Sequence, residues 1–394
     1  MSYMHEYIQN HYTANRLEEE LVNLIAVYNK VRDTYLFVFA TAIQKRLPEI
    51  QLDQDDYYMI ADILRPKKGL ERLDFYLETP GGRGETAEEI ARFLHQNFNY
   101  ISFIISGEAK SAGTILALSG HDILMTDTGS LGPIDAQVVL GRSVVSASDY
   151  VEWVNEKRKE AEENKKLNPF DAIMVAQITP GELVGVQQAY RYAQDLVTKW
   201  LPKYKFKNWD VTESRRIPVT EEMKQKRASE IAGILCNHSE WRSHGRSIKI
   251  QDLHTIGLRI TRIDDTPRLA ELVYRIQTVC RLLFGTTTAY KIYATEDTKL
   301  FKHAAPFNQP GRNLLSLPTP EVVQLEINCP NCNAKHQLYM KFIDNQQVDK
   351  DFKAKGCIPY PNNDKLKCSC GFEIDLSGLR NQVEMELQKK IIPS

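Results

Sequence analysis

The segment between residues 73 and 125 constrains the fold more than any other, because short apolar runs alternate there with helical patterns. Residues 73–77, 100–105 and 122–125 are rich in apolar and aromatic side chains, as buried strands are. A helical pattern begins at Thr86, and a second apolar helix is expected to run through Leu118. Strand, helix, strand, helix, strand predicts an α/β fold with a βαβαβ unit and right-handed crossovers.

Two turns of this unit carry residues suited to acyl transfer. The first is Thr79-Pro80-Gly81-Gly82, whose glycines permit positive φ and a close backbone approach. The second places Ser111 at the start of a helix, among small residues. A serine there is most often a helix N-cap, but it is also where a nucleophile would lie. Because both turns follow parallel strands, we expect them at the same sheet edge.

These segments resemble the Clp protease/crotonase superfamily, and most closely its serine dehydrogenase proteinase family, a relative of signal peptide peptidase A. The resemblance covers about residues 70–262 and rests on four blocks, 79–82, 110–114, 131–137 and 238–248. It implies a Clp/crotonase-like repeated ββα core and a serine peptidase with Ser111 as nucleophile. It also implies an oxyanion hole made by the N–H groups of Gly82, or Gly81, and of Ala112.

The general base is where this chain departs from the resemblance. Clp proteases place a histidine in the loop that here spans residues 129–137, and no histidine lies in it. One hypothesis is a triad of Ser111, a histidine from the 238–244 block (His238 or His244), and Asp135 as its orienting acid. Either histidine could instead be a structural hydrogen-bonding residue beside Trp241. A serine–lysine dyad, as in the signal peptide peptidase relatives, would draw on Lys157, Lys159, Lys165 or Lys166. These lysines lie in a highly charged stretch that favours solvated ammonium groups, which are poor bases.

The apolar pattern divides the chain into four parts. Residues 1–68 are expected to form a helical N-terminal extension, and residues 69–299 the peptidase domain. Residues 300–320 are rich in proline and polar side chains, which is typical of a linker. Residues 321–394 would form a small C-terminal domain.

Four cysteines in that C-terminal domain have the spacing of a metal site. Two tight turns carry them, Cys329-Pro-Asn-Cys332 and Cys368-Ser-Cys370-Gly371. Thiolates in such pairs can converge on one tetrahedral zinc, which would fold a segment with little core. We therefore expect a zinc ribbon with a structural Zn²⁺, since four cysteines leave no open position for catalysis. Cys357 could replace one ligand, and His336 is a weaker competitor.

Composition restricts the cellular compartment and the binding partners that are expected. The chain has 394 residues, 42% of them apolar, and a net charge of −1, which gives no support for a nucleic-acid or membrane surface. No secretory signal opens it, and clustered cysteines fit a reducing compartment, so a cytoplasmic enzyme is expected. A protein or peptide substrate and a homo-oligomer are implied by the resemblance. The absence of an unfoldase sequence leaves room for a separate ATPase or sensor partner.

Two other function classes remain open at this stage. The first is an inactive scaffold of the same fold whose zinc ribbon binds a partner or nucleic acid, motivated by the missing loop histidine. The second is an enzyme acting on acyl-thioesters, as crotonases do. Ser111 argues against the second, because crotonases need the oxyanion hole and no serine nucleophile.

Overall fold

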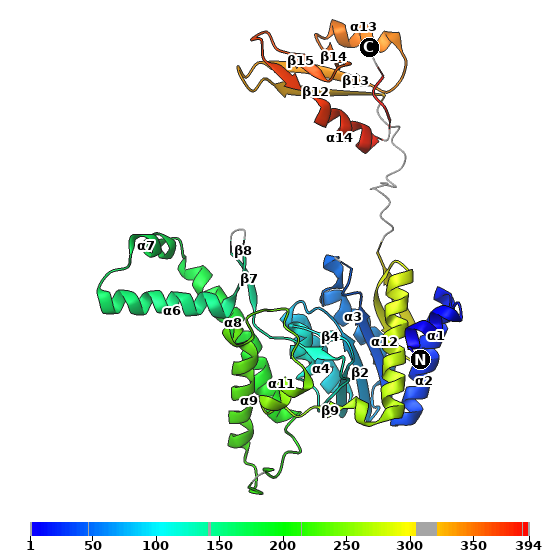
Figure 1. The fold of residues 1–394 in the computed structure, drawn as a ribbon, viewed down its shortest axis with the longest axis vertical. Helices are drawn as coiled ribbons and strands as arrows, with labels where there is room; N and C mark the ends of the chain where they lie inside the picture. The colour runs from blue at the N-terminus through cyan, green and yellow to red at the C-terminus, as the bar shows by residue number, and fades with distance from the viewer. Residues whose placement is uncertain are drawn as a thin grey trace. The chain divides into compact units, whose positions relative to one another are not determined.

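A computed structural model describes residues 2–45, 47–140, 143–213, 215–304, 321–387 and 389–392. The chain forms two compact units, residues 1–306 and 307–394 (Figure 1). Most of the predicted linker lies outside the described residues. The first unit holds the elements that carry the candidate active site, and the second holds the cysteine cluster.

A seven-stranded sheet forms the centre of the first unit, in the order β11-β10-β1-β2-β3-β5-β9. The strands are β1 (Tyr35–Thr41), β2 (Arg72–Glu78), β3 (Tyr100–Ile105), β5 (Asp122–Met125), β9 (Thr261–Arg262), β10 (Ala289–Ala294) and β11 (Lys299–His303). From β1 to β9 all neighbours are parallel, and β10 and β11 add an antiparallel edge. The predicted strands at 73–77, 100–105 and 122–125 are thus present, and the mixed α/β fold is confirmed.

Helices cover both faces of this sheet because each side buries its own apolar cluster. One face packs against α3 (Gln54–Leu64), α4 (Gly84–Asn97), α5 (Ala112–Ala117), α8 (Pro180–Lys203) and α9 (Glu221–Cys236). The other face packs against α1 (Tyr3–Gln9), α2 (Ala14–Arg32) and α12 (Pro267–Thr286). Short elements complete the unit: β4 (Glu108–Ala109), β6 (Ser130–Leu131), α10 (His238–Trp241) and α11 (Ile250–Thr255).

An arm projects from this body, formed by the part of the chain that follows Asp135 (Figure 1). It consists of the hairpin β7 (Gln137–Leu140) and β8 (Ser143–Ser146), the helices α6 (Ala147–Asn164) and α7 (Pro169–Ala176), and the first part of α8. The sequence pattern predicts helices at 149–167 and 182–201, and these correspond to α6 and α8 within a few residues. The rest of α8 packs along α9, which leads the chain back to the body.

The N-terminal segment differs from the sequence prediction. Residues 1–68 were expected to be helical, but β1 lies within them, between β2 and β10 at the centre of the sheet. Helix α2 ends because Asp33 adopts a left-handed conformation, with φ of 53°. The apolar run that follows is buried along its whole length. A continuous apolar run is compatible with a helix or a buried strand, which explains the error.

The predicted linker also begins earlier than the structure allows. Lys299–His303 forms β11, which pairs with β10, so these residues belong to the sheet. Apolar residues at helical spacing over 262–290 predict one long closing helix, but α12 (Pro267–Thr286) is shorter, because Thr261–Arg262 forms β9 and Ala289 begins β10. No helix among the described residues is both long and apolar enough to cross a lipid bilayer.

The second unit is small and buries its own apolar cluster. Its elements are β12 (Val322–Asn328), β13 (Lys335–Lys341), α13 (Gln346–Ala354), β14 (Ile358–Pro359), β15 (Lys365–Lys367), β16 (Glu373–Asp375) and α14 (Ser377–Leu387). The hairpins β12–β13 and β15–β16 carry the four cysteines in or beside their turns.

Candidate active site

Ser111 lies on a strained turn between β4 and α5. Its φ of 48° and ψ of −116° are rarely adopted by a residue with a side chain, at a cost of roughly 1–3 kcal/mol. Backbone hydrogen bonds hold the turn in place: Lys110 N–H donates to Thr79 O at 3.0 Å, and Gly113 N–H donates to Lys110 O at 2.7 Å. Such strain is found at functional sites, so the turn marks Ser111 as a candidate nucleophile.

The glycine turn lies directly against this serine. A Cβ added to Gly81 would lie 2.7 Å from Ser111 Cβ and 2.8 Å from Lys110 O. Only glycine fits there, since its φ of 106° is also unfavourable for other residues. The two predicted turns therefore meet, although 30 residues separate them.

Leu52 fixes which amide of this turn is free. Leu52 N–H donates to Gly81 O at 2.7 Å, and Leu52 O accepts from Arg83 N–H at 3.0 Å. In a trans peptide the C=O and N–H point in opposite directions, so the Gly82 N–H points away from Leu52. The Gly81 N–H instead lies 3.3 Å from Thr79 Oγ1. Among the described residues, the N–H groups of Gly82 and Ala112 donate to no protein acceptor.

Asp135 brings together two histidines from more than 100 residues later in the chain. One carboxylate oxygen lies 2.9 Å from His238 Nδ1, and the other lies 2.8 Å from His244 Nδ1. Gln137 Nε2 donates a third hydrogen bond to the same carboxylate at 2.7 Å. Asp135 is only 1% exposed, so its charge depends on these partners.

The carboxylate sets the protonation of both rings. Burial raises the pKa of Asp135, but the hydrogen bonds and charges of His244 and His238 outweigh it, and the net pKa is lowered. An ionised carboxylate only accepts, so each ring carries a proton on Nδ1. His238 Nε2 faces Asp149 of α6 at 3.7 Å. His244 Nε2 has no hydrogen-bond partner among the described residues, which leaves it free to accept a proton.

No hydrogen bond joins the Ser111 hydroxyl to either imidazole within the described part of the chain. The two sides of the site are nevertheless linked through neighbouring atoms. Lys110 Nζ donates to Arg246 O, two residues beyond His244, at 3.1 Å. Thr114 Oγ1 accepts from Gly132 N–H at 2.9 Å, which ties α5 to the loop that carries Asp135.

Of the lysines considered for a dyad, Lys157 and Lys159 lie in α6, and Lys165 and Lys166 follow its end. The Lys157 ammonium pairs with Asp171 at 2.7 Å and Glu160 at 3.0 Å. The hydrogen bonds that the ammonium donates to these carboxylates raise the pKa of Lys157, opposite to what a base requires. Lys159 is exposed and pairs with Glu163 at 3.8 Å. Among the described residues, no hydrogen bond joins Ser111 to any of these four lysines.

Three residues of this site received no role from the sequence. Leu52 and Thr114 position the glycine turn and the Asp135 loop, and no pattern around them indicated this. Lys110 is 5% exposed, and burial lowers its pKa to about 8, partly offset by Glu108. The usable signal was a lysine placed among small residues next to the candidate nucleophile.

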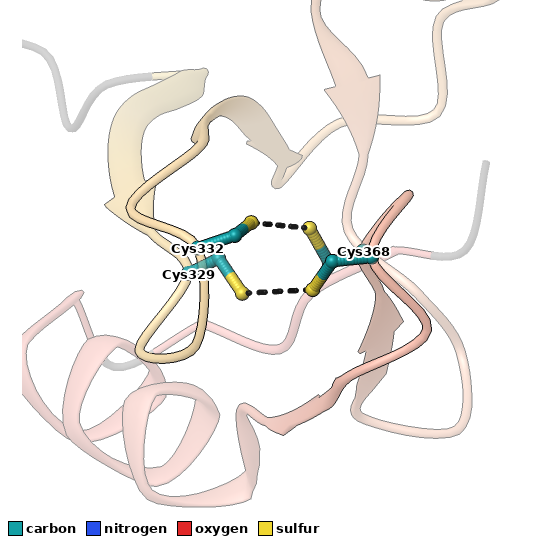
Figure 2. Close-up of side chains that lie close together, drawn as sticks. Cys329, Cys332 and Cys368 are labelled. Atoms are coloured by element: carbon teal, nitrogen blue, oxygen red, sulfur yellow. Dashed lines mark hydrogen bonds between the residues drawn. The ribbon is translucent and has the colours of Figure 1, made fainter.

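The four cysteine sulfurs of the second unit lie within 4.8 Å of one another. Cys329 Sγ lies 3.7 Å from Cys370 Sγ, and Cys332 Sγ lies 3.6 Å from Cys368 Sγ. Figure 2 shows the sulfurs pointing toward one another from two facing turns. These separations exceed a disulfide bond and suit sulfur ligands around one ion, so the cluster could hold a metal.

Of the two alternative ligands, Cys357 stands apart from this cluster of four, whereas His336 lies beside Cys368. Cys357 Sγ accepts a hydrogen bond from Gln324 Nε2 at 3.3 Å, away from the other sulfurs. His336 lies near enough to Cys368 to lower the pKa of that thiol, after the larger effect of the Cys370 backbone N–H. Three lysines of this unit form ion pairs, Lys335–Glu326, Lys341–Asp349 and Lys365–Glu373.

Comparison with known proteins agrees with the resemblance predicted from the motifs. Residues 50–179 match the family of ClpP-like SDH-type serine proteinases. Two uncharacterised proteins of Methanocaldococcus jannaschii are 33% and 35% identical over 66 residues. That stretch is 17% of this chain and 23% of each relative, so the chain matches less than a quarter of their length.

Among solved structures, two of a membrane-bound stomatin-specific protease, one with a substrate peptide, are similar. They are 15% and 16% identical and cover 56% of this chain and 79% and 74% of their own, each with a TM-score of 0.32. The resemblance to the serine dehydrogenase proteinase family is confirmed by the family match over residues 50–179. That segment has the ClpP-like fold and contains Ser111 and Asp135, whereas the zinc ribbon lies beyond it and stays a prediction.

Proposed function

We propose that this protein is a serine peptidase that hydrolyses peptide bonds through an acyl-enzyme on Ser111. The observation that carries the proposal is the contact between Gly81 and the strained Ser111 turn, where the Cβ of Ser111 would lie 2.7 Å from a Cβ at position 81. A nucleophile and backbone donors at one point are what acyl transfer requires. The match to a serine proteinase family supports the same chemistry.

The oxyanion would be held by the N–H groups of Gly82 and Ala112. Leu52 turns the Gly82 N–H outward by holding Gly81 O, and Ala112 N–H directly follows the nucleophile. Donors fixed in advance stabilise the charge of a tetrahedral intermediate without reorganising. The Gly81 N–H, weighed against Gly82 from the sequence, faces Thr79 Oγ1 and is the weaker choice.

His244 is the base that the geometry favours. Its Nδ1 proton lies on Asp135, which leaves Nε2 as the acceptor. His238 shares the carboxylate, but its Nε2 faces Asp149. We therefore assign His238 a supporting role in holding Asp135 ionised.

In the reaction, Ser111 Oγ would bond to the substrate carbonyl carbon while its proton passes to His244 Nε2. The carbonyl electron pair becomes the oxyanion, and its collapse breaks the C–N bond as His244 returns the proton to the leaving amine. Water then repeats the sequence on the acyl-enzyme and releases the carboxylic acid.

Fluorophosphonate labelling with mass spectrometry tests this assignment. We expect Ser111 to be labelled in the wild type and no label at that peptide in Ser111→Ala. His244→Ala should slow labelling on the order of 10²- to 10⁴-fold, and His238→Ala less than about tenfold. An unlabelled Ser111 in folded wild-type protein would refute the peptidase, and full labelling of both histidine variants would remove the histidine base.

The scaffold alternative loses its motivation in this geometry. It arose because the 129–137 loop lacks a histidine, yet His238 and His244 reach Asp135 in that loop from elsewhere. Nucleic-acid binding by the second unit gains no support, because acidic residues pair with Lys335, Lys341 and Lys365. The homo-oligomer, the ATPase or sensor partner and the cytoplasmic location stay predictions.

We further propose that Cys329, Cys332, Cys368 and Cys370 hold one structural Zn²⁺. The support is the donor set, four sulfurs within 4.8 Å, two of them on buried residues. When bound, zinc would supply folding free energy to a unit with a small core. Metal analysis should find one zinc per chain, and Cys332→Ser should lose it. Cys357→Ser is the matched control and should keep it. Retention of zinc by Cys332→Ser would refute this ligand set.

A further inference from the structure

Lys110 connects three segments of the candidate site through one buried ammonium group. Its Nζ donates to Leu131 O at 3.1 Å, to Arg246 O at 3.1 Å and to Ser247 Oγ at 2.9 Å. An ammonium has three donors, so all are used. The chain thus places a charged group beside the nucleophile and directs it entirely toward neighbouring segments.

The path of this side chain is enclosed closely. A Cβ added to Gly132 would lie 2.7 Å from Lys110 Cδ and 3.4 Å from Lys110 Cα. The φ of Gly132 is not in the left-handed region, so space for Lys110 is what requires a glycine there. At its other end, Lys110 is fixed by its backbone hydrogen bonds to Thr79 and Gly113.

Two of the three acceptors of Lys110, Arg246 O and Ser247 Oγ, lie in the segment that carries His244. Asp135 holds His244 at the start of this segment, and Ile248 pairs with Leu131 at its end, at 2.9 and 3.1 Å. Arg246 and Ser247 lie between these two anchors. Their bonds to Lys110 set the separation between this segment and the Ser111 turn, because Lys110 precedes Ser111 directly.

We propose that Lys110 is a positioning residue that holds the His244 segment at the distance from Ser111 that proton transfer needs. The inference rests on the proposed function and adds to it a group that touches neither substrate nor reacting atoms. A displacement of about 1 Å between reacting groups can cost on the order of 100-fold in rate. Holding this distance fixed can therefore outweigh the cost of burying a charged group.

Lys110 does not itself fit the role of base. Burial favours its neutral form, but its three donors are all directed at acceptors, which favours the ammonium. A base needs a lone pair directed at the Ser111 hydroxyl, and no such contact exists among the described residues. A lysine that acts as the base and a lysine that only positions the His244 segment also predict different pH profiles.

The test compares the pH dependence of Ser111 phosphonylation in Lys110→Met and in the wild type. In the wild type the rate should rise with pH, because a general base must be unprotonated to accept the Ser111 proton. Lys110→Met keeps the stem but removes the donors, so we expect labelling about 10- to 100-fold slower and a flattened pH profile. The variant should still fold, because Arg246 is exposed and water can reach its carbonyl.

Lys45→Met is the matched control. Lys45 also donates to two carbonyls, Thr287 O at 2.9 Å and Ala289 O at 2.6 Å, and burial also lowers its pKa. It should lose comparable thermal stability but keep the wild-type rate and pH profile. If Lys110→Met does not fold, Ser247→Ala decides, since it removes one acceptor and keeps the ammonium. A slower labelling rate and a flatter pH profile in Ser247→Ala support the positioning role, and a wild-type rate and profile overturn it.

The outcomes separate the two proposals. If Ser111 is unlabelled in the wild type, the peptidase itself fails. If the labelling rate of the wild type rises with pH as expected and Lys110→Met has the same rate and pH profile, only the positioning role fails. If Lys110→Met abolishes labelling at every pH while remaining folded, Lys110 is a base or a nucleophile activator and the positioning role is wrong.

Discussion

The nucleophile half of the site is made of backbone, whereas the acid–base half is made of side chains. The nucleophile half, residues 79–114, gathers Gly81, Gly82, Ser111 and Ala112 through turns that follow adjacent parallel strands. The acid–base half joins Asp135 to His238 and His244 over separations of 103 and 109 residues. Backbone geometry requires particular small residues at fixed places, while a side-chain network can be assembled from any segments that meet.

Removing the nucleophile should have the largest effect. Ser111→Ala should lower kcat/KM for a peptide substrate by at least about 10⁴-fold, because no covalent intermediate can form. Ser130→Ala is the control, since Ser130 is also buried nearby but lies on β6. Turnover by Ser111→Ala close to that of Ser130→Ala would show that the nucleophile half is not the reacting one.

Asp135→Asn should have the next largest effect, on the order of 10²- to 10⁴-fold in kcat/KM. An amide can donate to Nδ1 and so stabilise the tautomer that places the His244 proton on Nε2, where it blocks proton acceptance. Asp149→Asn is the control, because Asp149 faces the other ring, His238 Nε2, at 3.7 Å. Equal losses in both variants would mean that His238, and not His244, transfers the proton.

Gly81→Ala tests the nucleophile half without removing a functional group. The new Cβ would lie 2.7 Å from Ser111 Cβ, so we expect a loss of about 10- to 100-fold in kcat/KM and roughly 1–3 kcal/mol in stability. Gly69→Ala is matched in backbone strain, with φ of 89°, but nothing lies within 4 Å of its Cβ. Its loss should be in stability alone, and an equal loss of activity in both variants would reduce the effect to strain.

The smallest effect concerns the pH dependence of stability through Asp135. Its pKa is lowered in the folded protein, so its contribution is complete above the ordinary value of 3.8 and is lost as the pH falls through the lowered pKa. Urea unfolding of Asp135→Asn should lose this component below pH 4. An identical acid dependence in wild type and variant would show that the histidines do not stabilise the charge.

The sequence predicted that the two turns of the nucleophile half meet, since proline, paired glycines and a serine among small residues mark turns after parallel strands. That Ser111 is the nucleophile stays a proposal. The sequence also suggested that Asp135 and the 238–244 block meet, but only through the family resemblance, because no local pattern spans 103 residues. It could not tell His238 from His244, which differ in what each Nε2 faces. Strand β1 was missed because the continuous apolar or aromatic run from Tyr35 to Ala40 has no periodicity to reveal a strand.

The arm inserted between Asp135 and His238 has a consequence for how the protein matures. The Ser111 turn needs only contacts made within a few dozen residues, so it can form early during folding. The proton acceptor can contact Asp135 only after the chain has passed through α6, α8 and α9 and returned to the body, and closing long loops is slow. A nascent chain would therefore carry its hydroxyl in place but chemically idle, and hydrolysis would begin only once the last segment has returned.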